Sequence, residues 1–468
     1  MIKYPTLSLA ITALALACTG SLVAAERKAP NLIVIMTDDQ GYGDTGFNGC
    51  KDIPTPNMDR LAAAGAVCTN AYASYSVCAP SRAGFITGRY PQRFGFERNT
   101  AWQPKAPATG LAVQETTLAA ALHPYGYKSS VIGKWHLGAN DNFHPLNRGF
   151  DEFYGHLGGG HRYLPEELTI KNTLDCRNEP DSYRSWILRG FEPVRTERYL
   201  TEEFTREALD FVRRQKDTPF FLYLAYNAPH APLQAPAEEI AKFSHIKNEK
   251  RRTYAAMLTV VDRGVGQVLD LLDELKLTDD TIVFFFSDNG GPTSANGSNN
   301  APLRGFKSDP YEGGFRVPFA VRYPGKIPAG TTYAQPVSLL DVYATMAAIN
   351  QIPANAERPL DGVNIVPYLN GEKTGAPHER IYLRMFDTGA YAMREGDYKI
   401  VQPKKAEKPA LYNLAKDIAE RADISEGDAE RFTKMQATYQ DWNAQLIAPA
   451  FPGLDMREWA KPDAAAKD

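Results

Sequence analysis

The sequence predicts an α/β protein: a large, doubly wound mixed sheet flanked by helices, with a small α+β subdomain at the C-terminus. Two observations predict the sheet. Four short apolar runs lack period-2 alternation, as expected of strands that helices cover on both faces, and helical patterns fall between these runs. The predicted strands are Leu32–Met36, Ser129–Ile132, Phe220–Leu224 and Thr281–Phe286.

Three stretches between these strands carry helix signals. Thr55-Pro56 is typical of an N-cap followed by the first helical residue, and Gly65 is typical of a helix end. In two further stretches apolar side chains recur about once per helical turn, which predicts a buried helix face. The recurring residues are Leu200, Phe204, Ala208 and Phe211 in one stretch, and Met257, Val261, Val265, Val268 and Leu272 in the other.

The pattern of the sequence changes near Gly371. Beyond it, three segments alternate like exposed antiparallel strands, and a helical segment follows. These segments are Arg380–Met385, Ala390–Met393, Tyr398–Val401 and the helix near Glu430–Leu446. We therefore predict a large α/β domain over residues 26–370 and a small subdomain over residues 371–468.

The first 25 residues have the pattern of a signal peptide. Lys3 supplies a charged start, Leu7–Ala17 an apolar run, and Val23-Ala24-Ala25 a small-residue cleavage site. The apolar run is too short to cross a bilayer, and no later run is long enough. We expect an exported protein, periplasmic or secreted, without a transmembrane span. Lipidation at Cys18 is an alternative.

Composition excludes some classes of function. A net charge of −3 argues against a protein whose main role is to coat nucleic acid or an acidic membrane. Four cysteines follow the predicted signal peptide, which allows at most two disulfides, and no Cys-x-x-Cys pair supports a zinc knuckle or a thioredoxin-like site. They are Cys50, Cys68, Cys78 and Cys176.

Charged and polar residues follow all four predicted strands, and in open α/β sheets ligands bind beyond the carboxyl ends of the strands. The residues are Asp38 and Asp39 after the first strand, Lys134 and His136 after the second, His230 after the third, and Asp288 and Asn289 after the fourth. We expect them to converge on one site.

The acidic members of this set predict a metal site. Asp38, Asp39 and Asp288 would repel one another unless a cation lies between them. Oxygen-only ligands suit a hard divalent ion, and Ca²⁺ fits an exported protein better than Mg²⁺. The alternative is that the Asp-Asp and Asp-Asn-Gly sequences are ordinary turn or capping residues.

A second motif is Cys78-Ala79-Pro80-Ser81-Arg82. Pro80 fits the first turn of a helix, which places Cys78 just before a helix N-terminus that favours an anion. Arg82, one turn later, can bind an oxyanion or residue 78 itself. A buried structural cysteine and a thiolate nucleophile are the alternatives.

Six sequence blocks, in this order, resemble the type I (formylglycine-dependent) sulfatase family. They are Pro30–Asp39, Cys78–Arg89, Gly133–Gly138, Ala228–Pro232, Ser287–Gly291, and Leu303–Lys307 together with Glu312–Pro318. Whole-chain similarity is greatest to the bacterial polysaccharide sulfatases that act on carrageenan. The resemblance implies an alkaline-phosphatase-like fold.

The resemblance also implies a cofactor set. Cys78 would be oxidised after translation to formylglycine (3-oxoalanine) by a formylglycine-generating enzyme, and its hydrated aldehyde would be the nucleophile. One Ca²⁺ ion would be bound by residue 78 and four strand-end residues. Those four are Asp38, Asp39, Asp288 and Asn289.

The resemblance implies roles for the basic residues as well. Arg82 and Lys134 would orient the diol, and Lys134, His230 and Lys307 would hold the sulfate. His136 would assist breakdown of the sulfated intermediate. These roles agree with the chemistry, because fixed cations stabilise the charge on the leaving oxygen, and a histidine that titrates near neutrality can exchange a proton with it.

Four further residues are candidate sugar contacts: Arg98 for a second sulfate, Trp102 and Tyr163 for stacking, and His161 in the glycine-rich segment 156–161. That segment reads equally well as a solvated surface loop. The expected substrate is a sulfated polysaccharide or oligosaccharide, with carrageenan galactose sulfate preferred. A glycosaminoglycan-type sulfatase, a phosphate or phosphonate ester hydrolase of the same superfamily, and a non-catalytic glycan-binding protein are the alternatives.

Overall fold

The computed structural model describes Met1 and residues 29–168, 176 and 182–454. The predicted signal peptide and Cys18 lie outside the described residues, apart from Met1. The described strands are β1 Asn31–Thr37, β2 Ala66–Cys68, β3 Ala71–Tyr72, β4 Lys128–Lys134, β5 Glu152–His156, β6 Ile187–Arg189, β7 Glu192–Val194, β8 Phe220–Ala225, β9 Thr281–Ser287, β10 Phe319–Arg322, β11 Thr331–Tyr333, β12 Val337–Ser338, β13 Arg380–Met385, β14 Ala390–Glu395, β15 Tyr398–Gln402 and β16 Ala410–Asn413.

The described helices are α1 Pro56–Ala63, α2 Cys78–Thr87, α3 Leu118–Leu122, α5 Leu200–Arg214, α6 Ala237–Ala241, α7 Glu249–Glu274, α8 Glu312–Phe315, α9 Asp341–Ile349, α10 Val366–Leu369 and α11 Ala429–Asn443. None of them is long and apolar enough to serve as a membrane span.

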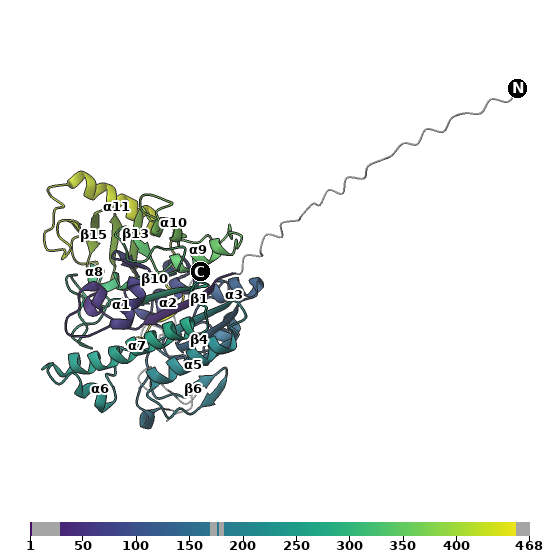
Figure 1. Ribbon diagram of the computed structural model, residues 1–468. Coiled ribbons are helices and arrows are strands. Elements are labelled where there is room, and N and C mark those ends of the chain that lie inside the picture. The colour runs from purple at the N-terminus through teal and green to yellow at the C-terminus, as the bar shows by residue number, and fades with distance from the viewer. Residues whose placement is uncertain (2–28, 169–175, 177–181, 455–468) are drawn as a thin grey trace.

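The centre of the molecule is a mixed sheet, which has ten strands within the described residues, in the order β11-β2-β10-β9-β1-β8-β4-β5-β6-β7 (Figure 1). The four strands predicted from apolar runs are β1, β4, β8 and β9. They lie side by side and parallel in the middle of this sheet. Antiparallel neighbours such as β10 make the sheet mixed. The predicted fold class is confirmed.

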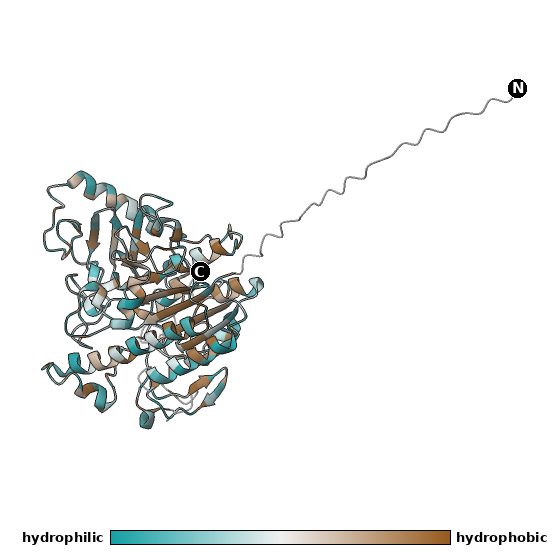
Figure 2. Cartoon of the chain, in the orientation of Figure 1, coloured by the Kyte–Doolittle hydropathy of each residue, from teal (hydrophilic) through white to brown (hydrophobic). Residues whose placement is uncertain are grey.

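Both faces of the sheet are covered by helices, as the apolar runs require. Leu32, Val34 and Met36 of β1 pack with residues of α2, α3 and α9 on one face. Ile33 and Ile35 point to the opposite face and pack with α1, α5 and α7. Figure 2 shows the resulting hydrophobic strands between helices with hydrophilic outer surfaces. Alternate residues of one strand therefore stabilise two separate cores.

The sequence-predicted helices are present, with one shift. The three predicted from capping and periodicity are α1, α5 and α7. Cys78 was expected just before the next helix, but α2 begins at Cys78 itself, with Val77 as its N-cap. The thiol-bearing residue is therefore part of the first turn, which fixes its backbone more firmly than a loop would.

A small antiparallel sheet, β13-β14-β15-β16, forms the C-terminal subdomain with α11 (Figure 1). Its first three strands match the prediction, while β16 was not expected. The predicted boundary near Gly371 stays a prediction. Trp442 and Tyr439 of α11 pack on this sheet.

A buried charge network joins this subdomain to the main domain. Lys399 of β15 contacts Glu312 of α8 and Glu420, each at 2.9 Å, and all three side chains are fully buried. Burial favours the neutral form of Glu312, but Lys399 and Arg316 outweigh it and lower the pKa of Glu312. Burial and the charge of Glu312 raise the pKa of Glu420. Lys399 therefore compensates two carboxylates that solvent does not reach.

Lys399→Met tests this network. Removing the ammonium leaves two facing carboxylates buried, so we expect the free energy of unfolding to fall by about 3–5 kcal/mol, measured by urea denaturation. Lys404→Met is the matched control. Lys404 pairs with Glu407 at the surface and is 61% exposed, so its loss should cost less than about 1 kcal/mol. Equal stability of the two variants would contradict this role.

Candidate active site

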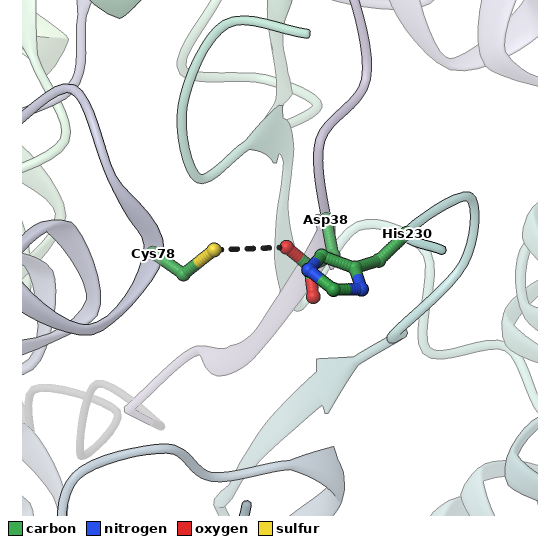
Figure 3. A group of neighbouring side chains, drawn as sticks. All are labelled: Asp38, Cys78 and His230. Atoms are coloured by element: carbon green, nitrogen blue, oxygen red, sulfur yellow. Dashed lines mark hydrogen bonds between the residues drawn. The ribbon is translucent and has the colours of Figure 1, made fainter. Parts of the chain in front are cut away.

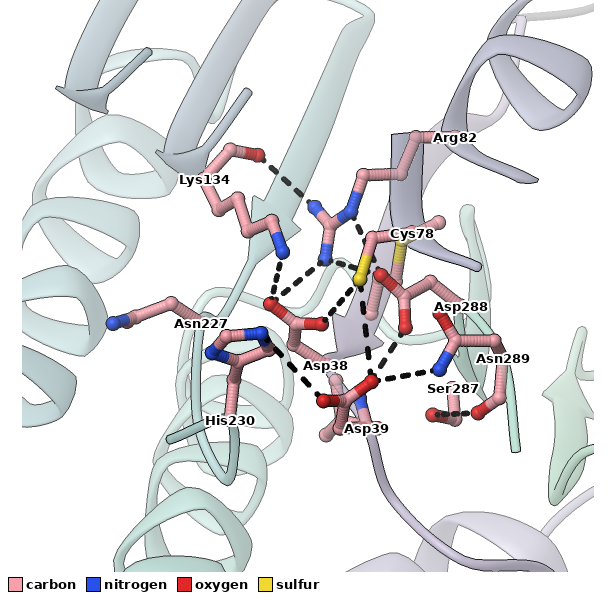
Figure 4. A network of polar contacts seen from close by, with 12 residues as sticks. Asp38, Asp39, Cys78, Arg82, Lys134, Asn227, His230, Ser287, Asp288 and Asn289 are labelled. Atoms are coloured by element: carbon pink, nitrogen blue, oxygen red, sulfur yellow. Dashed lines mark hydrogen bonds and ion pairs between the residues drawn. The ribbon is translucent and has the colours of Figure 1, made fainter. Parts of the chain in front are cut away.

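The carboxyl ends of β1 and β9 deliver the acidic residues to one point. Asp38 and Asp39 follow β1, while Asp288 and Asn289 follow β9, the neighbouring parallel strand. One ligand atom from each of the three aspartates and the Cys78 sulfur all lie within 4.8 Å of one another. Figure 4 shows these side chains pointing toward a common centre. The sequence-based expectation that the strand ends converge is met by the structure.

Cys78 faces these carboxylates from the first turn of α2. Its thiol donates a hydrogen bond to Asp38 Oδ1 at 3.3 Å (Figure 3). The same sulfur accepts a hydrogen bond from Lys307 Nζ at 3.1 Å. Burial, with the charge of Asp38, raises the pKa of the Cys78 thiol well above its usual value. An unmodified Cys78 is therefore a protonated thiol, which disfavours the thiolate-nucleophile alternative.

Three cations balance the three carboxylates. Arg82 donates to Asp288 Oδ2 from Nε, and its Nη2 lies near the same oxygen, both at 2.9 Å. Lys134 pairs with Asp38, and Lys307 Nζ lies 2.9 Å from Asp39 Oδ2. Arg82, Lys134 and the aspartates are at most 3% exposed. Without a further ion the cluster has no net charge, which permits its burial.

The donor set fits a hard divalent cation. Oxygens of Asp38, Asp39 and Asp288 surround the centre, and the Oδ1 atom of Asn289 is buried without a hydrogen-bond partner among the residues that the structure describes. An orphaned buried carbonyl is uncommon and costs free energy unless something binds it. No histidine nitrogen is needed to complete this oxygen set. The residues present therefore fit Ca²⁺.

The carboxylates differ in their tendency to ionise. Burial, with the charge of Asp38, raises the pKa of Asp288 to about 6. Burial also disfavours ionisation of Asp39, but the charge of Lys307 outweighs it and lowers the pKa of Asp39 to about 2. Three carboxylates this close are difficult to keep ionised together, and a bound divalent cation removes that difficulty.

Both predicted catalytic histidines are neutral in this environment. Burial, followed by the charges of Lys134 and Arg82, lowers the pKa of His136 well below its usual value. Burial lowers the pKa of His230 to about 3, despite Asp39, whose Oδ2 lies 3.6 Å from Nε2. The expectation that His136 titrates near neutrality is wrong for the free protein.

Positive φ angles concentrate at this site. Asp39, His136 and Ser308 have φ of 62°, 59° and 74°, a region that residues other than glycine rarely adopt. Each lies at or beside a predicted functional residue. Such backbone strain persists only where the surrounding contacts over-determine the conformation, and it is common at functional sites.

Three predicted sugar contacts lie inside the protein. Both ring nitrogens of His161 lie 2.9 Å from carbonyl oxygens, and Tyr163 donates its hydroxyl hydrogen to Asn227 O at 2.7 Å. Trp102 is 6% exposed and belongs to the core. The reading of segment 156–161 as a solvated loop is wrong, because His156 and His161 are both buried. The fourth predicted sugar contact, Arg98, lines a surface cavity.

Sequence reasoning missed two residues that support the site. Tyr223 accepts a hydrogen bond at its hydroxyl from Arg82 Nη1 at 3.3 Å. Asn99 Oδ1 accepts one from the backbone N–H of Ala79 at 3.0 Å, next to Cys78. A tyrosine inside the apolar run 220–224 was a signal for the first, since its hydroxyl needs a partner when buried. Nothing in the sequence marked Asn99.

Two family models match the chain. The model described as Sulfatase matches residues 30–352, and the one described as N-sulphoglucosamine sulphohydrolase, C-terminal, matches residues 307–446. N-acetylgalactosamine-6-sulfatase of Canis lupus familiaris is 31% identical over 96% of this chain and 93% of its own.

Solved structures give the same picture. Ps i-CgsB, solved in complex with k-i-k-neocarrahexaose, is 37% identical with a TM-score of 0.86, covering 93% of this chain and 98% of that one. The phosphonate monoester hydrolase SpPMH from Silicibacter pomeroyi has a TM-score of 0.66 at 17% identity, covering 90% of this chain and 96% of that one. The second likeness concerns the fold alone.

Proposed function

The chain belongs to the sulfatase family and is a sulfuric ester hydrolase, and from this premise we propose that it acts on a sulfated polysaccharide or oligosaccharide through an oxidised residue 78. The observation that carries the mechanism is the convergence of Cys78 with three buried carboxylates, two buried cations and the partly buried Lys307. Such a cluster presents an unusual density of fixed charge to a small anion.

Two groups that are not part of the encoded chain complete the proposal. A formylglycine at residue 78, as its hydrate, supplies a nucleophilic hydroxyl and a route to release sulfate by re-forming the aldehyde. A Ca²⁺ ion held by Asp38, Asp39, Asp288, Asn289 and residue 78 supplies positive charge.

The remaining roles belong to residues of the chain. Lys307, which lies 3.1 Å from the Cys78 sulfur, holds the sulfate together with Lys134 and His230. Arg82 orients residue 78, and Arg82 is itself fixed by Asp288 and Tyr223. His136, whose ring nitrogens have no hydrogen-bond partner among the described residues, assists breakdown of the sulfated intermediate.

A carrageenan galactose sulfate is the substrate we favour. Its support is the 37% identity, over 93% of this chain, to a protein solved with k-i-k-neocarrahexaose bound. A glycosaminoglycan-type sulfate is the second candidate, favoured by the 31% identity to an N-acetylgalactosamine-6-sulfatase. Export to the periplasm or outside the cell agrees with substrates of this size.

Cys78→Ser tests the nucleophile. Serine cannot form the aldehyde hydrate and lacks its route for releasing sulfate, so we expect sulfate release to be abolished while the melting temperature and substrate binding are retained. Cys50→Ser is the control, because Cys50 is half-buried beside Asp52, away from the cluster. Release by Cys78→Ser at a rate near that of the unmodified sequence would rule out the mechanism.

Removal of Ca²⁺ with EGTA tests the metal. The ion binds only the folded state, and at 100 times its Kd it adds about 2.7 kcal/mol to the free energy of unfolding. We expect chelation to lower both activity and melting temperature, and added Ca²⁺ to restore them. In Asp39→Asn the melting temperature should respond little to either reagent. Metal removal should be verified by elemental analysis. A melting temperature that is unchanged after verified removal would count against the calcium assignment.

A panel of defined oligosaccharides tests the substrate. Carrageenan oligosaccharides and N-acetylgalactosamine 6-sulfate should be compared at equal concentration, with NMR identifying the position that loses sulfate. We expect release from a galactose sulfate of carrageenan. Sulfate release from N-acetylgalactosamine 6-sulfate alone would show that the substrate is of the glycosaminoglycan class.

A further inference from the structure

A cavity of about 650 Å³ opens beside the cluster, between the two domains. Val77 and Ser308 line one wall, and they are the chain neighbours of Cys78 and Lys307. Asn99, which binds the backbone of Ala79, lies in the same wall. The turn between β13 and β14, with Phe386 and Asp387, contributes to the lining as well. A group bound here would be adjacent to a sulfate ester held at residue 78.

Arg98 and Asp387 form a paired polar edge of this cavity. Arg98 Nε donates to Asp387 Oδ2 at 2.9 Å and Nη2 donates to Oδ1 at 2.5 Å, a two-point pair. The Asp387 side chain is 54% exposed, whereas that of Arg98 is 16% exposed. The carboxylate therefore remains able to accept hydrogen bonds from a ligand hydroxyl.

A second ion pair, between Glu97 and Arg384, lies at the same cavity. Glu97, also in the lining, accepts a hydrogen bond from Arg384 Nε at 3.1 Å and is buried. The negative charges of the two carboxylates and the positive charges of the two guanidiniums therefore sum to zero. The earlier assignment of Arg98 to a second sulfate is thus at odds with its geometry, because its charge is already engaged by Asp387. A second anion here would meet the half-exposed carboxylate of Asp387.

Phe386 adds an apolar surface. Its side chain is 47% exposed, which is unusual for phenylalanine, and the Arg384 guanidinium lies 5.6 Å from the ring centroid. An exposed aromatic ring next to hydrogen-bonding groups is suited to a sugar ring, which has apolar C–H faces and hydroxyl edges.

We propose that this cavity binds an uncharged sugar unit adjacent to the sulfated one and selects against a neighbour that carries a sulfate or carboxylate. The inference rests on the proposed function for its position in the substrate chain. Phe386 contacts the ring face and Asp387, paired with Arg98, accepts from its hydroxyls. No bond forms or breaks in this cavity.

Hydrolysis of two oligosaccharides tests the selection. They have equal length and the same target sulfate, and differ in whether the adjacent unit is neutral or sulfated. We expect kcat/KM to favour the neutral neighbour about tenfold or more. Asp387→Asn removes the repelling charge and releases Arg98, so the ratio of the two kcat/KM values should fall or reverse. A ratio near one, or one unaffected by Asp387→Asn, would overturn the inference.

Binding of a fully desulfated galactan oligosaccharide, measured by calorimetry, provides a readout without turnover. Phe386→Ala should weaken this binding at least about fivefold, with the melting temperature as the check on folding. Phe191→Ala, which removes an equally exposed ring stacked on His144, should leave it unchanged. If Phe386→Ala weakens binding but the unsubstituted protein releases sulfate from no substrate, the proposed function alone is contradicted. Sulfate release with no binding of the neutral oligosaccharide would contradict this inference alone.

Discussion

The structure depends on one constraint: three buried carboxylates at the ends of neighbouring parallel strands must each be paired with a cation. Asp38, Asp39 and Asp288 have almost no contact with solvent. Such charges are costly to remove from water unless each is paired with good geometry. The parallel register of β1 with β9, together with helix α2, holds the pairs in place. A sulfate ester, which carries one negative charge, is therefore offered donors that need not reorganise.

Much of the central fold could be predicted from the sequence, because the local pattern and the final environment agree there. The strands β1, β8 and β9 are apolar at nearly every position, and both faces of each are buried. The residues after each strand converge because parallel neighbours end at the same edge of the sheet. Pattern and packing point to the same structure in this part of the chain.

The rest could not be predicted, because it depends on contacts between distant parts of the chain. Strands such as β2, with three residues, join the sheet only through partners more than 200 residues away. Segment 156–161 is polar in sequence, yet its histidines are buried. The depressed pKa of His230 arises from burial and from Lys307 and Lys134, which lie far from it in the chain. None of these environments is encoded in a local spacing.

The C-terminal subdomain takes part in the site rather than merely following it. Arg304 Nη1 donates to Glu420 O at 2.6 Å, and the backbone N–H of Glu312 donates to Glu420 Oε2 at 2.7 Å. These contacts anchor both ends of the segment that carries Lys307. The same subdomain supplies Phe386 and Asp387 to the cavity beside residue 78. The subdomain thus anchors the segment of Lys307 and lines the neighbouring cavity.

The central claim is that the charged cluster surrounds an oxidised residue 78. Peptide mass spectrometry of active protein, prepared in a host that oxidises such cysteines, tests it most directly. The account predicts that the peptide containing residue 78 has the mass of the aldehyde or its hydrate. Fully active protein in which that peptide carries an intact thiol would contradict it.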